Sequence, residues 1–137
     1  MRWVGDIPAD VDSNFRICNT EEEVVQYFNT SKGFRYHGEK AAIEKDFENF
    51  TFPASLSGLV RVRFIVNCNA EAGRFLIDAW DNKYSPIMLG EVEEDELLGQ
   101  LKALNGWIPL TYRGKQVDYY LYLTFKITNG QIQEILP

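Results

Sequence analysis

Hydrophobic and polar residues alternate most regularly along residues 107–127 of the chain. One set of alternate positions near its end is hydrophobic: Tyr119, Leu121, Leu123, Phe125 and Ile127. The other set carries phenol, hydroxyl and ammonium groups: Tyr120, Tyr122, Thr124 and Lys126. A period of two predicts a strand with one buried face. We therefore expect residues 118–127 to form one wall of the core and to be the main contact surface for a partner.

A second alternating stretch predicts a β-hairpin. Residues 59–68 place hydrophobic side chains on one face: Val60, Val62, Phe64, Val66 and Cys68. After a turn at residues 69–73, residues 73–80 alternate again and are expected to return beside the first strand. Asn129-Gly130 is a type I′ turn signal, after which residues 131–135 could fold back as a short strand. In that case the tail would occupy the edge of residues 118–127, and a partner would displace it or contact the tyrosine face.

Three segments have the spacing of amphipathic helices. Thr20 followed by Glu23 matches a capping box and predicts a short helix as far as about Asn29. The stripes of the other two helices are Ile43, Phe47 and Phe50 in residues 39–50, and Leu97, Leu98, Leu101 and Leu104 in residues 91–104. The acidic runs 21–23 and 91–96 then lie at helix starts, where the helix dipole favours carboxylates, and we do not interpret them as metal sites.

These elements predict an α+β fold with a small antiparallel sheet in a β-β-α-β core. The last strand is expected to pair with the first, which gives the strand order 2-1-3, and the helices are expected to cover one face of the sheet. We divide the chain into an N-terminal extension with two helices, residues 1–50, and a core, residues 51–137. Both parts are expected to form one globular unit.

Composition and charge restrict the possible partners. The 137 residues carry a formal net charge of −6, which argues against nucleic acid and against anionic membrane surfaces. Hydrophobic runs are too short for a membrane span, and the first ten residues lack the hydrophobic region of a signal peptide. Cys18 and Cys68 are either two buried thiols or one disulfide. With one histidine in the chain, they are a poor basis for a zinc site.

No combination of residues indicates catalysis. His37 is the only histidine, and the sequence has neither a glycine-rich phosphate loop nor the serine motif of hydrolases. We therefore expect a protein that is not an enzyme and that needs neither cofactor nor metal. Binding of an extended peptide at the strand edge fits the pattern best. The candidate partner-binding residues are Asp118, Tyr120, Tyr122, Thr124 and Lys126. Alternatively, the tyrosines only cover the sheet and pack on Arg61 and Arg63.

The order of several motifs resembles the C-terminal domain of TonB-family proteins, in particular a branch found in Bacteroidota. Near the start of the core, the residues that carry the resemblance are Phe52, Pro53, Gly58, Val60, Val62 and Phe64. In the second half they are Trp107, Pro109, Gly114, Val117 and Phe125, and the spacing from the tryptophan to Val117 is their most specific part.

The resemblance implies a periplasmic or cell-envelope location, although this chain shows no signal or anchor. It also implies a partner such as a TonB-dependent outer-membrane transporter, whose extended peptide would pair with residues 118–127. An oxidising compartment would favour a Cys18–Cys68 disulfide. The alternative function is a structural or subunit-interface domain of an envelope assembly, with no role in energy transduction.

Overall fold

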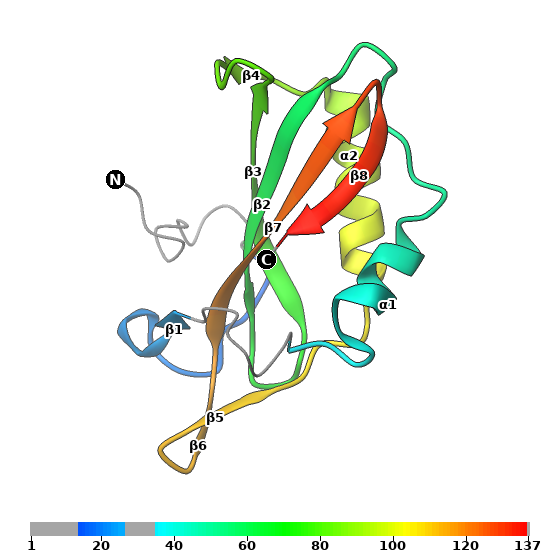
Figure 1. Cartoon of the computed structure of the whole chain (residues 1–137). Helices are drawn as coiled ribbons and strands as arrows, with labels where there is room; N and C mark the ends of the chain where they lie inside the picture. Colours follow the sequence, from blue (N-terminus) through cyan, green and yellow to red (C-terminus); the bar gives the residue numbers. More distant parts are fainter. Residues whose placement is uncertain (1–13, 27–34, 137) are drawn as a thin grey trace.

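The computed structural model describes residues 14–26 and 35–136 (Figure 1). The main sheet is formed by β1 (Val25–Gln26), β2 (Gly58–Val66), β3 (Ala72–Asp81), β4 (Pro86–Ile87), β7 (Tyr119–Thr128) and β8 (Gln131–Leu136). A small separate hairpin consists of β5 (Leu110–Tyr112) and β6 (Lys115–Val117). The helices are α1 (Glu39–Asp46) and α2 (Glu91–Ala103), with a 3₁₀ turn, η2, at Glu21–Glu23. The predicted mixed α and β class is confirmed.

The strand β2 lies at the centre of the sheet, between β3 and β7. Both pairings are antiparallel, and Val62 lies opposite Ile77 on one side and Leu123 on the other. Beyond β3 comes β4, and beyond β7 come β8, which is antiparallel, and β1, which is parallel. The long alternating segments therefore form the inner strands, because each of them presents a continuous hydrophobic face.

Both helices lie on the same side of the sheet, and the main hydrophobic core fills the space beneath them (Figure 1). The predicted leucine stripe of α2 faces this core, where Leu97 and Leu101 are fully buried. The helix α1 contributes Ile43, and the turn after it contributes Phe47, whose ring lies 5.0 Å from that of Phe125. Burial of these side chains against the inner sheet face is the main force that holds the helices in place.

The opposite sheet face carries a second, smaller hydrophobic cluster. Ile65 and Tyr120 form it with Val24, and Phe15 and Ile17 pack against it. The segment of residues 14–25 therefore covers the part of the outer face around Tyr120. This outer cluster explains why an N-terminal segment without periodicity is held against the sheet.

The predicted helix after Thr20 is wrong over the described residues. Only the turn Glu21–Glu23 is helical, and Thr20 makes no side-chain cap; its hydroxyl instead donates to the Glu23 carboxylate at 3.0 Å. The chain then becomes extended, because the N–H of Val25 donates to the Asp118 carbonyl oxygen and β1 pairs with β7. Tertiary pairing of β-branched residues overrides a weak local helix signal here. Residues 27–34, where the rest of that helix was expected, lie outside the described residues.

Two further boundaries differ from expectation. The helix α1 ends at Asp46 rather than Phe50, and the turn after it still brings Phe50 against Phe47 and Phe52. The expected loop 81–90 contains the short strand β4, which pairs with the end of β3. The predicted return strand after Asn129-Gly130 is confirmed as β8.

Candidate functional site

The outer edge of β7, where the sequence predicts peptide binding, is occupied by two short segments of the same chain. The strand β8 pairs with β7 from Thr124 to Thr128, and β1 pairs with Tyr119 and Tyr120. Within the described part of the chain, no strand pairs with Leu121–Leu123 on this side. Among the described residues, only the short gap at Leu121–Leu123, between β1 and β8, is left open on this edge. A longer strand from a partner can therefore pair with β7 only if it replaces β8.

Side-chain burial and hydrogen bonds both hold β8 in place. Ile135 is 1% exposed and belongs to the main core. At the other end of the strand, the turn is clamped by the loop before β2: Gly130 donates to the Leu56 carbonyl oxygen, and its own carbonyl accepts from the Phe52 N–H, each at 2.8 Å. Displacing β8 exposes the Ile135 side chain at a cost of about 1.5–3 kcal/mol unless a partner side chain takes its place.

The five predicted partner-binding residues do not share one environment. Asp118 is completely buried, Tyr120 is buried in the outer cluster, Tyr122 and Thr124 are half-buried, and Lys126 is exposed. Of these side chains, Tyr122, Thr124 and Lys126 remain accessible on the polar face. The alternative in which the tyrosines cover the sheet fits Tyr120, which lies under Val24.

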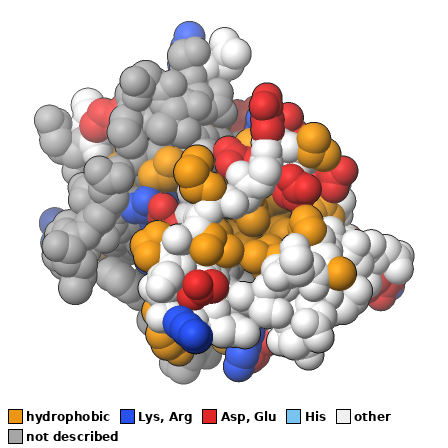
Figure 2. All heavy atoms as spheres, turned by 90° about the horizontal axis from the view of Figure 1, so that it is seen from above, with side chains coloured by type: hydrophobic (Ala, Val, Ile, Leu, Met, Phe, Trp, Pro, Cys, Tyr) orange, Lys and Arg blue, Asp and Glu red, His pale blue; other side chains and the backbone are white. Residues whose placement is uncertain are grey.

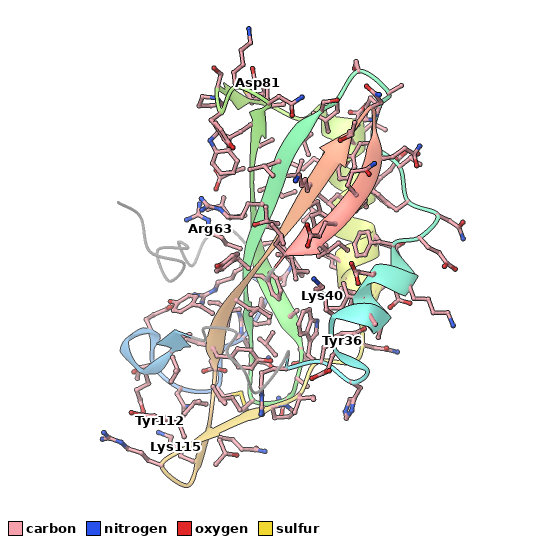
Figure 3. The ribbon with its side chains drawn as sticks, viewed as in Figure 1. Tyr36, Lys40, Arg63, Asp81, Tyr112 and Lys115 are labelled. Carbon is pink, nitrogen blue, oxygen red and sulfur yellow. A yellow bond between two sulfur atoms is a disulfide. The ribbon has the colours of Figure 1, made fainter. Side chains whose placement is uncertain are left out.

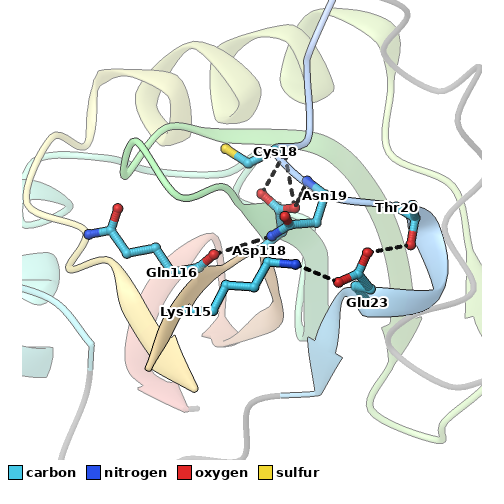
Figure 4. A network of polar contacts seen from close by, with 7 residues as sticks. All are labelled: Cys18, Asn19, Thr20, Glu23, Lys115, Gln116 and Asp118. Atoms are coloured by element: carbon cyan, nitrogen blue, oxygen red, sulfur yellow. Dashed lines mark hydrogen bonds and ion pairs between the residues drawn. The ribbon is translucent and has the colours of Figure 1, made fainter. Parts of the chain in front are cut away.

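Asp118 is the centre of a polar network that fixes the N-terminal segment (Figure 4). Its carboxylate accepts hydrogen bonds from the backbone N–H groups of Cys18, at 2.9 Å, Asn19, at 3.0 Å, and Cys68, at 3.3 Å. A buried carboxylate is tolerated when several N–H donors replace its hydration. The Asp118 carboxylate is therefore already engaged within the protein, and it joins three segments that are far apart in the sequence.

The Cys18–Cys68 disulfide lies beside this network. The two Cα atoms are 6.0 Å apart, a separation typical of disulfides, so the disulfide alternative is confirmed. Asn67, next to Cys68, adds a hydrogen bond from its amide nitrogen to the Arg16 carbonyl oxygen at 2.9 Å. The N-terminal segment is thus held by one covalent bond and by several hydrogen bonds on either side of it.

A solvent-exposed ion pair extends the network to the β5–β6 hairpin. The Lys115 ammonium lies 2.8 Å from a Glu23 carboxylate oxygen, and the Asn19 side chain donates to the Gln116 carbonyl oxygen (Figure 4). The hydrogen bond from Lys115, followed by the one from Thr20, lowers the pKa of Glu23 below its ordinary value. The hairpin, which extends away from the sheet, is therefore linked to the segment that Asp118 holds.

A search of protein-family models, of curated proteins and of solved structures finds no match to this chain. Within the described ranges, no helix is long and hydrophobic enough to cross a membrane, and no three histidine, cysteine or acidic side chains are grouped so that they could hold a metal ion.

Most of the residues that carry the resemblance to TonB C-terminal domains lie in the core. Those that are buried are Phe52, Gly58, Val60, Val62, Phe64, Trp107, Val117 and Phe125, whereas Pro53 and Gly114 are exposed and Pro109 is half-buried. The Trp107 ring lies 5.2 Å from that of Phe64 and makes an edge contact with Tyr36 at 4.8 Å. The motif residues thus have packing roles, and their spacing reflects the core rather than a contact surface.

An ion-pair cluster occupies the outer face of β2 and β3. Asp78 lies 2.9 Å from Arg63 and 3.3 Å from Arg61, and the Arg61 guanidinium lies over the Trp80 ring at 5.0 Å. Arg63 is buried on the side of the sheet away from the helices (Figure 3). Asp78 is thus shared between two arginines, one of which is buried.

A groove lies beside β3, and no pattern in the sequence predicts it. Its volume is about 380 Å³, and it lies where β4 and the chain after it separate from β3. The residues that line it are Ile77, Asp78, Ala79, Trp80, Pro86, Ile87, Met88, Leu89 and Glu94. Met88 is 95% exposed, which is unusual for a large hydrophobic side chain and could have been anticipated only from the unexplained hydrophobic run at residues 86–89.

Proposed function

We propose that this protein is a non-enzymatic binding domain of the cell envelope that resembles the TonB C-terminal domain. In this proposal it pairs β7 with an extended segment of a partner protein. The observation that carries the proposal is the closure of the β7 edge by two short pieces of chain, β1 and β8, instead of one continuous strand. An edge that is closed in this way can be opened without breaking any central strand pairing.

The partner segment is proposed to take the place of β8. This strand is joined to β7 by a single tight turn at Asn129-Gly130 and pairs with β7 alone in the sheet, so it can leave without breaking a pairing of β2 or β3. The incoming strand would restore the main-chain hydrogen bonds to β7 and fill the space of Ile135 with a side chain of its own. The binding free energy is then the difference between the pairing free energy of the partner strand and that of β8. Because the two pairings are similar, this difference is small, as expected for a reversible contact.

The order of the central strands supports the resemblance. The hairpin β2–β3, the helix α2 and the strand β7 follow one another in the chain, and β2 lies between the other two strands. This order supports the proposal of a β-β-α-β core with strand order 2-1-3, which the connectivity of the predicted elements suggested. The Cys18–Cys68 disulfide supports an oxidising compartment such as the periplasm, where a TonB-dependent transporter would be the partner.

The test is a titration with peptides that carry the TonB box, the extended transporter segment proposed to pair with β7. Binding is monitored by the shifts of the backbone amide signals. A second protein, with the exposed pair Lys126→Cys and Glu134→Cys, locks β8 to β7 by a new disulfide, because these residues lie opposite each other. We expect shifts along β7 in the parent protein, no binding by the oxidised lock, and recovery on reduction, with the reduced parent as the control. Equal binding by the oxidised lock, or shifts that avoid β7, would refute strand exchange.

One observation favours the alternative of a structural or subunit-interface domain. Ile135 and the clamped turn at Gly130 tie β8 into the core, so the edge can also be permanently closed. In that case the protein should co-purify with its assembly partner and should not bind the peptides. The substitution Ile135→Ala distinguishes the two functions, because it weakens the packing of β8. If β8 exchanges with the peptide, peptide affinity should increase several-fold; if β8 is only structural, the variant should still show no peptide binding.

A further inference from the structure

The other side of the sheet has an edge that is only partly covered. The strand β4 pairs with β3 at two positions only, Ala79 with Ile87 and Trp80 with Pro86. After Ile87 the chain turns away toward α2, and the groove of about 380 Å³ opens between β3 and Met88–Leu89. Among the described residues, no strand pairs with Ile77 on this side. The groove thus begins where the short strand β4 stops.

The backbone of β3 presents hydrogen-bonding groups to this groove. The N–H of Asp81 donates to the Ser85 carbonyl oxygen at 3.0 Å, which shows that Asp81 directs its main-chain groups toward the β4 side. Alternate residues of a strand point their N–H and C=O groups the same way, so those of Ala79 and Ile77 also point to that side. Ala79 already lies opposite Ile87. Ile77 therefore offers a donor and an acceptor to an incoming strand.

The lining combines a hydrophobic floor with an acidic rim. Ile77, Ile87 and Leu89 are half-buried, and Met88 is fully open to solvent. Glu94 lines the groove from the exposed side of α2, and Glu91 is exposed three residues before it. Figure 2 looks onto this end of the molecule and shows hydrophobic side chains in a hollow with acidic side chains around it. A hydrophobic side chain with positive charges beside it is the complementary ligand.

We propose that this groove binds an extended segment of a partner protein in which a hydrophobic residue alternates with lysine or arginine. The segment continues the line of β4, pairs with β3 at Ile77, places its hydrophobic side chain against Met88 and Leu89, and directs its cations toward Glu94. The site shares strand addition with the proposed function but uses the opposite edge of the sheet. It therefore allows the protein to hold a second partner while β7 is engaged.

The experiment uses a fluorescent seven-residue peptide that alternates lysine with valine, and the same peptide with glutamate in place of lysine. Binding is measured by anisotropy, and the site is located by amide shifts of the intact protein. We expect the lysine peptide to bind with shifts at Ile77 and Met88, and the glutamate peptide not to bind. Raising the salt concentration should weaken the lysine peptide, because the exposed charges are screened.

Two variants test the groove itself, and one serves as the matched control. Glu94→Lys should weaken the lysine peptide about fivefold, and Met88→Ser should weaken it by a similar factor, while both variants fold because the two side chains are exposed. Asp95→Lys makes the same charge change on the next residue, which does not line the groove, and should change affinity less than about twofold.

The outcomes separate this site from the one at β7. Equal weakening by Glu94→Lys and Asp95→Lys, or shifts confined to β7 and β8, would overturn the groove proposal and leave the proposed function standing. Binding at Ile77 that persists in the protein with β8 locked supports two independent sites. If neither the lysine peptide nor the TonB-box peptide binds, both proposals fail.

Discussion

Removing the Cys18–Cys68 disulfide is expected to lower the free energy of unfolding by about 4 kcal/mol. The bond joins residues 50 positions apart, and the loss of chain entropy in a cross-linked unfolded loop of that length gives this value. The folded state should change little, because the Asp118 carboxylate still binds the backbone of Cys18, Asn19 and Cys68. The effect therefore acts mainly on the unfolded chain. For a domain of typical stability, about 5–15 kcal/mol, it is a large fraction of the total.

The assay is urea unfolding of the double substitution Cys18→Ser and Cys68→Ser beside the oxidised parent. Besides the lower free energy, the denaturant slope should increase, because the unlinked chain exposes more surface when it unfolds. Amide exchange at Asn19 monitors the folded segment and should remain slow. A loss below about 1 kcal/mol, or rapid exchange at Asn19 in the folded variant, would refute the reasoning. The second result would show that the bond, not Asp118, holds the segment.

Four further substitutions, each at a single residue, give testable predictions. Asp118→Asn should lower the free energy of unfolding by about 3 kcal/mol in urea, because charged hydrogen bonds to buried N–H groups are lost; a loss under about 0.5 kcal/mol would contradict this role. The Glu23 carboxyl should titrate below its ordinary pKa, and Lys115→Met should raise that pKa in an NMR titration. Its contribution to stability is present above the pKa of the unfolded chain and is lost as the pH falls through the lower folded pKa. Gly58→Ala should destabilise the protein by more than about 1 kcal/mol, because Gly58 has φ 149° and a Cβ there would overlap the Trp80 carbonyl. Gly99→Ala, in open space on α2, should instead stabilise it by about 0.5–1 kcal/mol, and thermal or urea unfolding distinguishes the two.

The parts of the fold that the sequence predicts are those with long periodic patterns. The strands β2 and β7 and the helix α2 each repeat their hydrophobic period several times, and tertiary contacts only reinforce that preference. The turn at Asn129-Gly130 is specified by residues that adopt positive φ, and both do so, at 50° and 79°. Local chemistry and the final fold agree at these positions.

The N-terminal segment could not be predicted, because its structure is determined by residues about a hundred positions away. Thr20 and Glu23 have the spacing of a helix start, but Val25 pairs with Tyr119 and Cys18 binds Asp118. The role of Asp118 was hidden for the same reason: an aspartate next to a strand looks like a surface residue. The groove at β3 depends on the two-residue strand β4, which is too short to show a period.

The separation of Asp118 from its partners also has a kinetic consequence. The hydrogen bond to Cys18 spans 100 residues, and β1 pairs with β7 across a similar distance. Contacts between residues so far apart in the sequence form late in folding. Most of the intervening chain must be ordered before such a contact can lower the free energy of the protein. Substitutions at Asn19 or Val24 should therefore accelerate unfolding while leaving the refolding rate nearly unchanged. The segment of residues 14–25 is thus among the last parts of the described fold to reach its final position.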